Sequence, residues 1–416
     1  YDVAMIARER SRGIREGLPE RAFAGLLHAG CDTALRTVPP AVPRHARWGG
    51  DQTAVVNGER LLDRDRFDEG LRQDAVAAGV VLHAGRIDRL EDADGIWTAA
   101  VATDGGTEII HAQYLIEARG RQAPRRRILA RGPQTLATAR PFRARDALTP
   151  ATYVESLDNG WIWAAAPGDG TIYVQAVGDP PGAGITPSPE PLLARSRLVA
   201  PLIGEPIGPV IARDAGMVLH ADLVTPRMLR VGDAAFAIDP LSGHGLYEAV
   251  AGALRGAAVV HTLIQHPERG GLARRFYENR ARGAFLRHAR TGRDFYRAER
   301  RFADAPFWTV RRDWPDDAPI HAAPDAAPPE IARRPVLVGQ TIEEREVVVT
   351  ADHPDGVYVI DGVPLVPLLR LAQEANATPA LLAENLAAAP VQVEKALAWL
   401  RLRGLLPSLT SGAPAP

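Results

Sequence analysis

Cysteine is almost absent from this chain of 416 residues, and Cys31 is the only one. A single cysteine excludes a disulfide within the chain and any metal centre built from several thiolates. No apolar run reaches the roughly 18 residues that a membrane span needs, and the first residues show no secretory signal. We therefore predict a cytoplasmic protein without a membrane partner, and no metal site is expected.

An excess of charge of either sign is also missing. The formal net charge is −1, from 49 basic and 50 acidic residues. Such a balance provides no long-range field that would attract nucleic acid or an anionic membrane, so nucleic acid is not expected as a partner. Lysine occurs only once, as Lys395. The length is sufficient for two or three domains with cores of their own.

A glycine-rich G-x-G-x-x-G turn is missing near the N-terminus. YDVAMI (residues 1–6) predicts a buried strand of a parallel sheet, and a glycine-rich turn and a helix normally follow such a strand at once. Here the charged stretch ARERSRGIREGLPE follows it. Either the protein lacks this fingerprint, or a segment is missing from the sequence after Ile6. We favour the second explanation, because the strand has no evident partner for its register.

Periodic patterns elsewhere predict a mixed α/β fold. Residues 63–78 have apolar side chains at helical spacing, and the three apolar segments that follow, separated by glycine turns, are typical of strands. Residues 152–177 predict a three-stranded meander with turns at DNG and GDG. A Pro- and Ala-rich linker is expected at 313–336. A hairpin with its turn at HPDG and several helices then predict a small C-terminal domain.

The most specific pattern is RVGDAAFAIDPLSGHGLYEA, which begins at Arg230. Asp233 follows an apolar strand, where its carboxylate could accept hydrogen bonds from sugar hydroxyls. Pro240, Gly243 and Gly245 allow the backbone to approach a flat ligand closely. A helix that starts near Gly245 directs free N–H groups and the positive end of its dipole toward that ligand. The alternative is a joint without a ligand, but the combined spacing favours a flavin site.

Three further segments are similar to motifs of a known family, as this segment is. LDRDRFDEGL contains an R-x-x-F-D motif that starts at Arg64; IEARGR is similar to a D-A-x-G-R motif, with Glu117 in place of the aspartate; and EGLPE, residues 16–20, is similar to a segment that lies over a flavin. Over about residues 1–310 the chain resembles the FAD-dependent monooxygenases built like aromatic hydroxylases and tryptophan halogenases.

The resemblance implies a Rossmann-like FAD-binding domain, an interleaved substrate domain with an antiparallel sheet, and a small winged-helix-like C-terminal domain. The expected bounds are 1–31, 60–133 and 216–290 for the FAD-binding domain, 32–59, 134–215 and 291–330 for the substrate domain, and 337–408 for the C-terminal domain.

The same resemblance implies how the cofactor is bound. Arg64 and Asp233 would hold FAD, the loop from Pro240 through Gly243 to Gly245 would face the isoalloxazine ring, and Leu246 would begin the helix beneath it. NADH or NADPH would reduce the flavin, and oxygen would then be transferred to an electron-rich ring. The cofactor carries the difficult step, while the protein positions it and excludes water.

Candidate substrate and catalytic residues are less specific. Trp161 and Trp163 lie in WIWAAAPGDG, which resembles the W-x-W-x-I-P element of halogenases, although Pro167 lies one residue late. These tryptophans either line a substrate cavity or pack as one face of a sheet. Halogenases carry the chlorinating species on a lysine, and Lys395 lies outside the flavin part, so halogenation is not favoured. His244 could exchange a proton beside the ring, or it could contribute only its backbone.

The C-terminal domain indicates the kind of substrate. It resembles the winged-helix elements that bind a leader peptide as an added strand in the modification of ribosomally made peptides. Its few basic residues disfavour DNA binding. A flavin hydroxylase joined to a peptide-binding element suggests a peptide or protein substrate, and the combined resemblance implies hydroxylation of an aromatic side chain, in particular tryptophan, in a peptide or small protein, as in tryptophylquinone biogenesis. Two alternatives stay open: a hydroxylase of a free small aromatic compound, and a peptide-binding chaperone without flavin.

Overall fold

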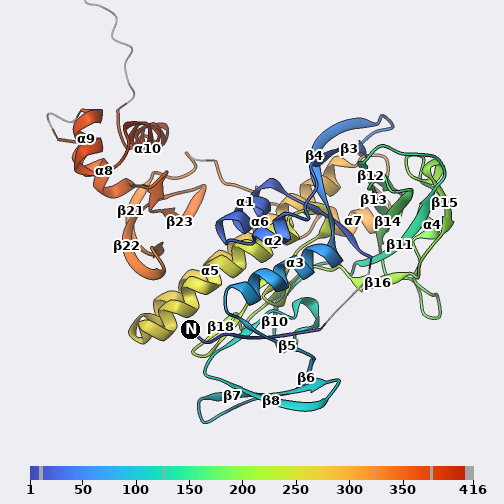
Figure 1. Cartoon of the computed structure of the whole chain (residues 1–416). Coiled ribbons are helices and arrows are strands. Elements are labelled where there is room, and N and C mark those ends of the chain that lie inside the picture. The colour runs from blue at the N-terminus through green and yellow to red at the C-terminus, as the bar shows by residue number, and fades with distance from the viewer. Residues whose placement is uncertain (9–12, 125–126, 324, 375–377, 408–416) are drawn as a thin grey trace, which may run out of the picture. The chain divides into compact units, whose positions relative to one another are not determined.

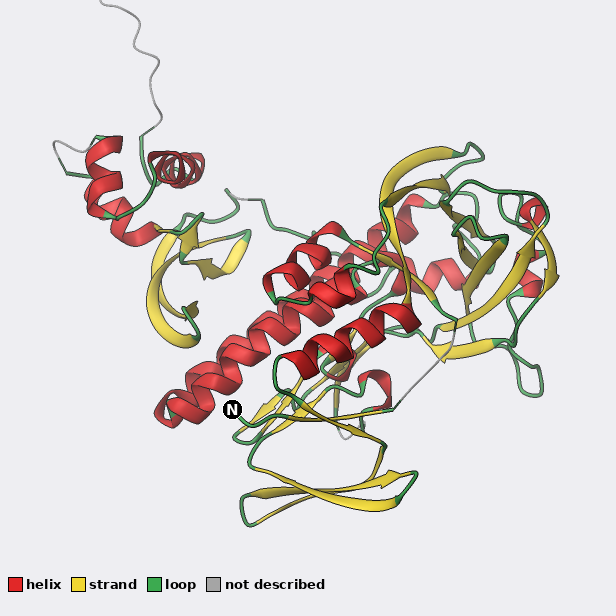
Figure 2. Cartoon of the chain, in the orientation of Figure 1, coloured by secondary structure: helices red, strands yellow, loops and turns green. Residues whose placement is uncertain are grey.

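The computed structural model contains two compact units (Figures 1 and 2). It describes residues 1–8, 13–124, 127–323, 325–374 and 378–407. The first unit comprises Tyr1–Gly256 and Ala284–Asp317, and the second comprises Ala257–Gly283 and Ala318–Pro416. The boundaries after Gly256 and Gly283 fall within the two long helices, α5 (Gly245–Gln265) and α6 (Gly270–Ala298), and the third follows Asp317. Among the described residues no helix combines the length and the apolar character that a membrane span requires.

Two pairs of parallel strands lie in the predicted FAD-binding region. β1 (Ala4–Ala7) pairs with β5 (Val81–Ala84), and β9 (Leu115–Glu117) pairs with β19 (Met228–Arg230). The predicted first strand is therefore present, but the expectation that it is buried is wrong, because Ala4 and Met5 are exposed and the next two residues are only half-buried. The expectation that it has no partner is wrong, because β5 sets its register, and this removes our argument for a missing segment after Ile6. Residues 9–12, which follow the strand before β2 (Arg15–Leu18), lie outside the described residues.

Three helices pack around a small core that also includes Leu18 and Leu62. They are α1 (Glu20–His28), α2 (Asp32–Leu35) and α3 (Arg64–Ala77). α3 confirms the helix predicted from apolar spacing, and the Asp63 carboxylate caps it by accepting bonds from the first backbone N–H groups. α2 approaches α3 closely at Gly70, where a Cβ would lie 2.6 Å from the Cα of Ala34. Only glycine permits this approach.

A nine-stranded sheet, on the right of Figure 1, contains strands from the segments 32–59 and 134–215 of the predicted substrate domain, together with β2. Its strands run in the order β15-β11-β14-β13-β12-β3-β4-β2, with β16 also beside β11. The bounds are β3 (Ala41–Arg47), β4 (Ala54–Asp63), β11 (Leu136–Ala144), β12 (Ala151–Leu157), β13 (Gly160–Ala166), β14 (Thr171–Gly178), β15 (Ile203–Pro206) and β16 (Ile211–Asp214). The meander predicted over 152–177 is confirmed as β12–β14. The mixed α/β class is confirmed as well.

The remaining elements of the first unit are short. The strands after α3 form the separate meander β6 (Arg86–Ala93), β7 (Ile96–Thr103) and β8 (Gly106–Ala112). The others are β10 (Ile128–Arg131), α4 (Glu190–Leu193), β17 (Val218–His220), β18 (Val224–Thr225), β20 (Phe236–Ala237) and α7 (Pro306–Arg312). β10, β17 and β20 form one small sheet.

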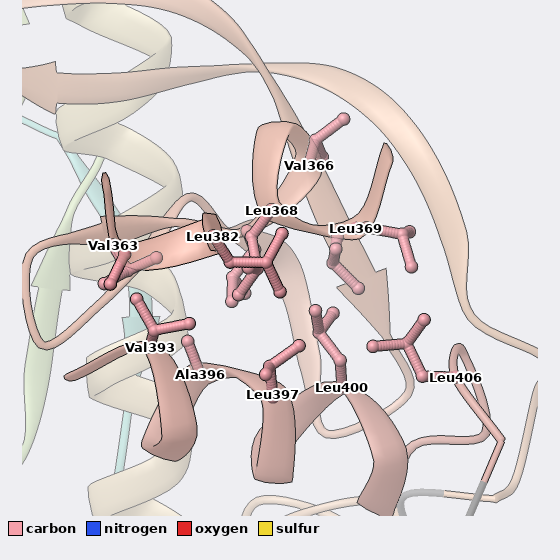
Figure 3. Close-up of a cluster of buried hydrophobic side chains, with 13 residues drawn as sticks. Val363, Val366, Leu368, Leu369, Leu382, Val393, Ala396, Leu397, Leu400 and Leu406 are labelled. Carbon is pink, nitrogen blue, oxygen red and sulfur yellow. The ribbon is translucent and has the colours of Figure 1, made fainter. Parts of the chain in front are cut away.

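The C-terminal part of the second unit is a three-stranded sheet with three helices. Its elements are β21 (Glu330–Val338), β22 (Thr341–Thr350), β23 (His353–Val357), β24 (Val359–Ile360), β25 (Val363–Pro364), α8 (Leu365–Ala372), α9 (Pro379–Asn385) and α10 (Pro390–Leu402). Figure 3 shows leucine and valine side chains of these helices meeting in one core. Two expectations are wrong: β21 starts inside the predicted linker, and the hairpin turns at Ala351 and Asp352, so that HPDG belongs to β23.

Candidate functional site

The segment that begins with β19 continues through a loop into helix α5, in the predicted order of strand, loop and helix. Asp239 caps a short 3-10 helix, Pro240–Ser242, by accepting a hydrogen bond from the N–H of Leu241 (2.9 Å). Gly243 ends that helix with a φ of +64°, in the left-handed region that favours glycine. α5 begins two residues later, at Gly245. The loop therefore leads directly into the N-terminus of a 21-residue helix.

The two motifs IEARGR and GDA meet at the ends of β9 and β19. Arg121 forms an ion pair with Asp233, with 3.4 Å between Nε and Oδ2. Arg121 also donates to the carbonyl oxygens of Gly216 (2.6 Å) and Ile238 (3.3 Å) and so fixes the start of the loop. The Asp233 side chain keeps 42% of its surface exposed, so a ligand can reach its carboxylate. Burial on the other side of Asp233 raises its pKa, and Arg121 opposes that shift.

Arg64 connects α3 to the EGLPE segment. Its guanidinium donates to Asp68 (Nη2–Oδ1 2.9 Å) and pairs with Glu16 of β2. Although burial lowers the pKa of Arg64, the two carboxylates raise it above its ordinary value. Arg64 and Glu16 also act electrostatically on Asp233. Arg64 and Asp233, which lie far apart in the sequence, are therefore near enough in the fold to interact electrostatically.

The two glycines of the loop leave room for a ligand. A Cβ built on Gly243 or Gly245 meets no protein atom within 4 Å. Open space therefore lies in front of the helix N-terminus, whose first N–H groups lack partners within the helix and carry positive character. Together with an accessible carboxylate and two arginines, this donor set fits FAD, which has sugar hydroxyls, a pyrophosphate and an aromatic ring.

His244 belongs to a cluster that the sequence did not predict. Its half-buried ring is tilted against that of His288, with 5.3 Å between centroids, and its Nδ1 contacts the carbonyl oxygen of Ser242. His288 on α6 contacts the buried Glu248 of α5. Burial lowers the pKa of His244, which favours the neutral imidazole. The sequence indicates Glu248 only weakly as a member of this cluster, because it is an acidic residue four positions after His244 in an apolar helix. Nothing in the sequence indicates His288, which lies in an arginine-rich stretch.

The two predicted substrate tryptophans lie on β13 in different surroundings. Trp161 is 2% exposed and packs in an aromatic cluster, where its Nε1 lies 3.3 Å from the hydroxyl of Tyr296. Trp163 is half-buried, donates to Glu59 (Nε1–Oε1 3.2 Å) and meets Tyr173 edge-on. Trp161 therefore has the packing of a sheet face, and Trp163 remains the better candidate for a contact with substrate.

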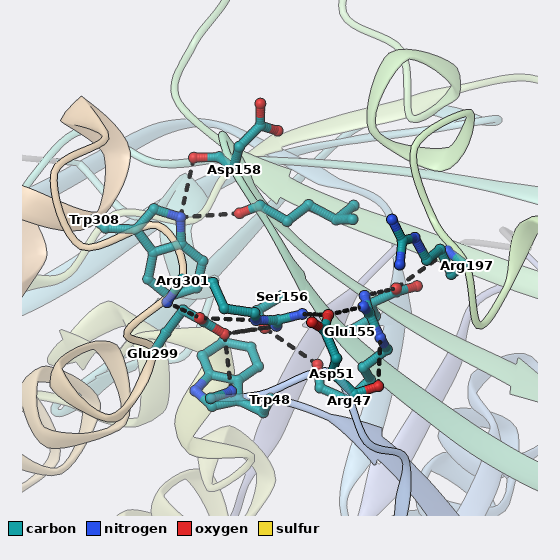
Figure 4. A network of polar contacts seen from close by, with 12 residues as sticks. Arg47, Trp48, Asp51, Glu155, Ser156, Asp158, Arg197, Glu299, Arg301 and Trp308 are labelled. Atoms are coloured by element: carbon teal, nitrogen blue, oxygen red, sulfur yellow. Dashed lines mark hydrogen bonds and ion pairs between the residues drawn. The ribbon is translucent and has the colours of Figure 1, made fainter.

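Buried charges connect the sheet to the end of α6, as Figure 4 shows. Glu299 accepts bonds from the hydroxyl of Ser156 (2.5 Å), the N–H of Gly49 (2.8 Å) and the guanidinium of Arg301 (2.8 Å). Although burial raises the pKa of Glu299, these donors lower it to about 2. Within the described ranges, no three His, Cys, Asp or Glu side chains form a group that could hold a metal ion.

Comparison with known proteins places these features in context. No family model matches the chain. The chain is 28% identical over 364 residues to a tryptophan 2-halogenase of Chondromyces crocatus, an alignment that covers 74% of this chain and 68% of the relative. It is 38% identical to the solved structure of the peptidyl tryptophan dihydroxylase QhpG, described as essential for tryptophylquinone cofactor biogenesis. That match covers 98% of this chain and 94% of QhpG, with a TM-score of 0.82.

Solved halogenases share the fold at lower identity. The flavin-dependent halogenase CmlS is 17% identical, with coverage of 97% of this chain and 91% of CmlS and a TM-score of 0.73. The myxobacterial chondrochloren halogenase CndH is 19% identical, with coverage of 74% and 80% and a TM-score of 0.64. The overall fold of this chain is therefore shared with solved flavin-dependent halogenases.

Proposed function

The chain belongs to the family of flavin-dependent monooxygenases and halogenases that includes peptidyl tryptophan dihydroxylases, and we propose that it hydroxylates a tryptophan side chain in a peptide or small protein during tryptophylquinone biogenesis. The single observation that carries this proposal is the likeness to QhpG, which extends over nearly the whole of both chains. The likeness to the tryptophan 2-halogenase spans a smaller part of this chain, at lower identity.

FAD, when bound, would supply the oxygen-transfer chemistry. The chain's own residues would bind and orient it. Asp233 would accept bonds from sugar hydroxyls, and Arg64 and Arg121 would act on the phosphate side. The loop that ends at Gly245 would face the ring, with the positive end of α5 directed toward its pyrimidine edge. His244, as a neutral imidazole, would accept a proton there, and its burial favours this neutral state. The reductant would be NADH or NADPH.

The position of the only lysine supports hydroxylation over halogenation. Lys395 lies on α10 in the second unit, where its ammonium pairs with Asp361 at 2.7 Å. The first unit, which contains the flavin loop, has no lysine in its sequence. A halogenase of the kind that carries the halogen on a lysine would lack its carrier in that unit.

The C-terminal sheet would recognise the peptide. β21 lies at one edge of the order β21-β22-β23 and has nine residues, enough to accept an added strand. Two apolar side chains of β21, Ile331 and Leu337, are exposed. A leader or partner segment that pairs with this edge would raise the local concentration of its target tryptophan near the flavin, and such tethering can change apparent affinity by about 10²–10⁴.

The test is a reaction of the purified protein with FAD, NADH or NADPH, oxygen and a tryptophan-containing peptide. The expected product carries one or two added oxygen atoms on tryptophan, located by fragmentation in a mass spectrometer. Equal modification of free tryptophan would instead favour a hydroxylase of small aromatic compounds. Peptide binding without flavin binding would favour the chaperone alternative. Reaction in bromide or chloride tests for a halogenated product.

A further inference from the structure

A buried chain of hydrogen bonds connects the substrate sheet to the predicted flavin loop. The indole Nε1 of Trp161 on β13 donates to the hydroxyl of Tyr296 on α6 (3.3 Å). That hydroxyl donates to Oδ2 of Asp239 (3.0 Å). The other carboxylate oxygen of Asp239 accepts from the N–H of Leu241 (2.9 Å). Three elements that are distant in the sequence therefore meet through side-chain groups that are almost completely buried.

Asp239 determines the shape of the loop. Its carboxylate caps the short helix Pro240–Ser242, and its carbonyl oxygen accepts a bond from the hydroxyl of Ser242 (2.8 Å). Gly243 follows directly, and α5 begins at Gly245. If the carboxylate loses a hydrogen-bond donor, one of its buried oxygens remains unsatisfied. This costs free energy and favours a rearrangement of the loop.

Packing alone does not require a hydroxyl on residue 296. The Tyr296 ring meets Phe307 and Trp308 edge-on, with 5.9 and 5.7 Å between centroids, and the residue is 2% exposed. Phenylalanine would preserve these ring contacts. A buried hydroxyl is costly unless it is hydrogen-bonded, and here it is bonded on both sides, by Trp161 and Asp239. The hydroxyl therefore has a role that the ring does not supply.

We propose that Tyr296 is a positioning residue, which holds the Asp239 carboxylate and thereby the loop from Asp239 to Gly245 in its flavin-binding shape, and that Trp161 orients the Tyr296 hydroxyl. This inference rests on the proposed function in one respect, namely that the loop faces FAD. In this proposal Trp161 supports cofactor binding indirectly, through the Tyr296 hydroxyl, and does not line a substrate cavity.

The charged groups around Asp239 influence the pKa of its carboxyl group. Arg311 and Arg293 line the small cavity beside the carboxylate and the Tyr296 hydroxyl, and Arg121 acts on Asp239 from the side of the GDA motif. Burial raises the pKa of Asp239, whereas the bonds from Leu241 and Tyr296 and the arginines lower it. Removal of the Tyr296 hydroxyl must therefore raise this pKa further.

The main experiment compares Tyr296→Phe with Tyr153→Phe. Tyr153 is half-buried on β12, stacks on His45 and lies outside the loop from Asp239 to Gly245, so its variant controls for the loss of a phenol hydroxyl. We expect the dissociation constant of FAD, measured near neutral pH by quenching of flavin fluorescence, to rise about tenfold or more in Tyr296→Phe. Tyr153→Phe should bind FAD as the wild type does.

A pH series distinguishes positioning from packing. Because protonated Asp239 accepts hydrogen bonds less well, FAD affinity should fall on the acid side, and in Tyr296→Phe this fall should begin at a higher pH than in the wild type. In Asp239→Asn no carboxyl is present, so the acid-side fall due to this group should disappear. Wild-type affinity and an unchanged pH profile in a folded Tyr296→Phe would overturn the proposal, and so would an acid-side fall that persists unchanged in Asp239→Asn.

Two further outcomes are informative. If Tyr296→Phe does not fold, as judged by circular dichroism, Trp161→Phe serves instead. It removes only the outer donor and should move the acid-side fall in the same direction by a smaller amount, and an unchanged profile would overturn the proposal. A wild-type protein that binds no FAD would overturn both this inference and the proposed function. A wild type that binds FAD but does not hydroxylate peptide would contradict only the proposed substrate.

Discussion

His288 of α6 and Glu248 of α5 lie 2.9 Å apart, measured between Nε2 and Oε1, in the buried joint of the two helices. Arg255 reaches the second carboxylate oxygen of Glu248 at 3.1 Å. These partners lower the pKa of Glu248, although burial alone would raise it. A negative charge is thereby fixed close to His244, whose ring lies against that of His288.

Glu248→Gln should lower the pKa of His244 further. Burial already lowers it, and the Glu248 carboxylate is one of the groups that oppose this shift. The measurement is a pH titration of histidine ring signals by NMR, in which His244→Asn identifies the resonance among the 11 histidines. An unchanged titration in Glu248→Gln would show that the His288–Glu248 pair does not control the charge of His244.

Asp233→Ala should weaken FAD binding. Each hydrogen bond from its carboxylate to a sugar hydroxyl contributes about 0.5–1.5 kcal/mol, so the dissociation constant should rise about tenfold or more. Asp104→Ala is a matched control, because Asp104 lies in the exposed turn between β7 and β8. Equal FAD titrations for both variants would contradict the assignment of the GDA motif.

Gly245→Ala should separate ligand binding from folding. The added Cβ meets no protein atom within 4 Å, and alanine favours a helix over glycine by about 1 kcal/mol. The free protein should therefore keep or slightly raise its thermal midpoint, while FAD binds more weakly because the methyl group occupies its space. Gly243→Ala should show the same loss with an added cost of about 1–2 kcal/mol for its positive φ. Normal flavin binding and turnover in both variants would mean that the loop does not face the ring.

Glu299→Gln should destabilise the first unit by about 1–3 kcal/mol near neutral pH, because it weakens buried bonds to Ser156, Gly49 and Arg301. The folded-state pKa of about 2 lies below the ordinary 4.5, so this stabilisation is complete above about pH 4.5 and is lost as the pH falls toward 2. The difference in thermal midpoint between variant and wild type should therefore shrink over that interval. Glu91→Gln, at an exposed position of β6, should change the midpoint little at any pH.

Leu337→Glu should weaken recognition of a full-length peptide. Leu337 is 41% exposed on the edge strand β21, and a charge there would disfavour an added apolar strand, so KM should rise about tenfold while FAD affinity stays constant. Leu402→Glu on α10, at a position that is 78% exposed, is the control. Equal KM values would assign the C-terminal domain a different role.

Substitution is preferable to deletion for this test. Truncation after Ala332 would cut β21, and the second unit also contains Ala257–Gly283, where Thr262 Oγ1 accepts a bond from the N–H of Ile342 (2.8 Å). Loss of the C-terminal residues would leave part of α5 uncovered. A truncated protein is therefore informative only if it remains monodisperse.

The sequence by itself determined the local parts of the fold and of the site. Apolar spacing predicted α3 and the β12–β14 meander, and the Asp233, Gly243 and Gly245 pattern predicted a strand, a loop and a helix N-terminus. These features depend on backbone preferences and on neighbours a few residues apart, so a linear pattern contains them. The partner of β1 escaped prediction because it is β5, which is distant along the chain. The start of β21 escaped prediction for a different reason: its partner β22 follows after two residues, but the Pro- and Ala-rich composition of this stretch is typical of a linker.

Only the tertiary structure decided which side chains meet. Arg121 reaches Asp233, Tyr296 reaches Asp239, and His288 reaches Glu248 across elements that are separated by many residues. Each pair joins an ordinary-looking arginine, tyrosine or histidine to a buried or half-exposed carboxylate, and no local pattern marks it. Its position is fixed by how helices and strands pack, and its energy by burial, because a charge or hydroxyl removed from water must find a partner. Chemistry at the candidate site therefore depends on contacts that folding alone creates.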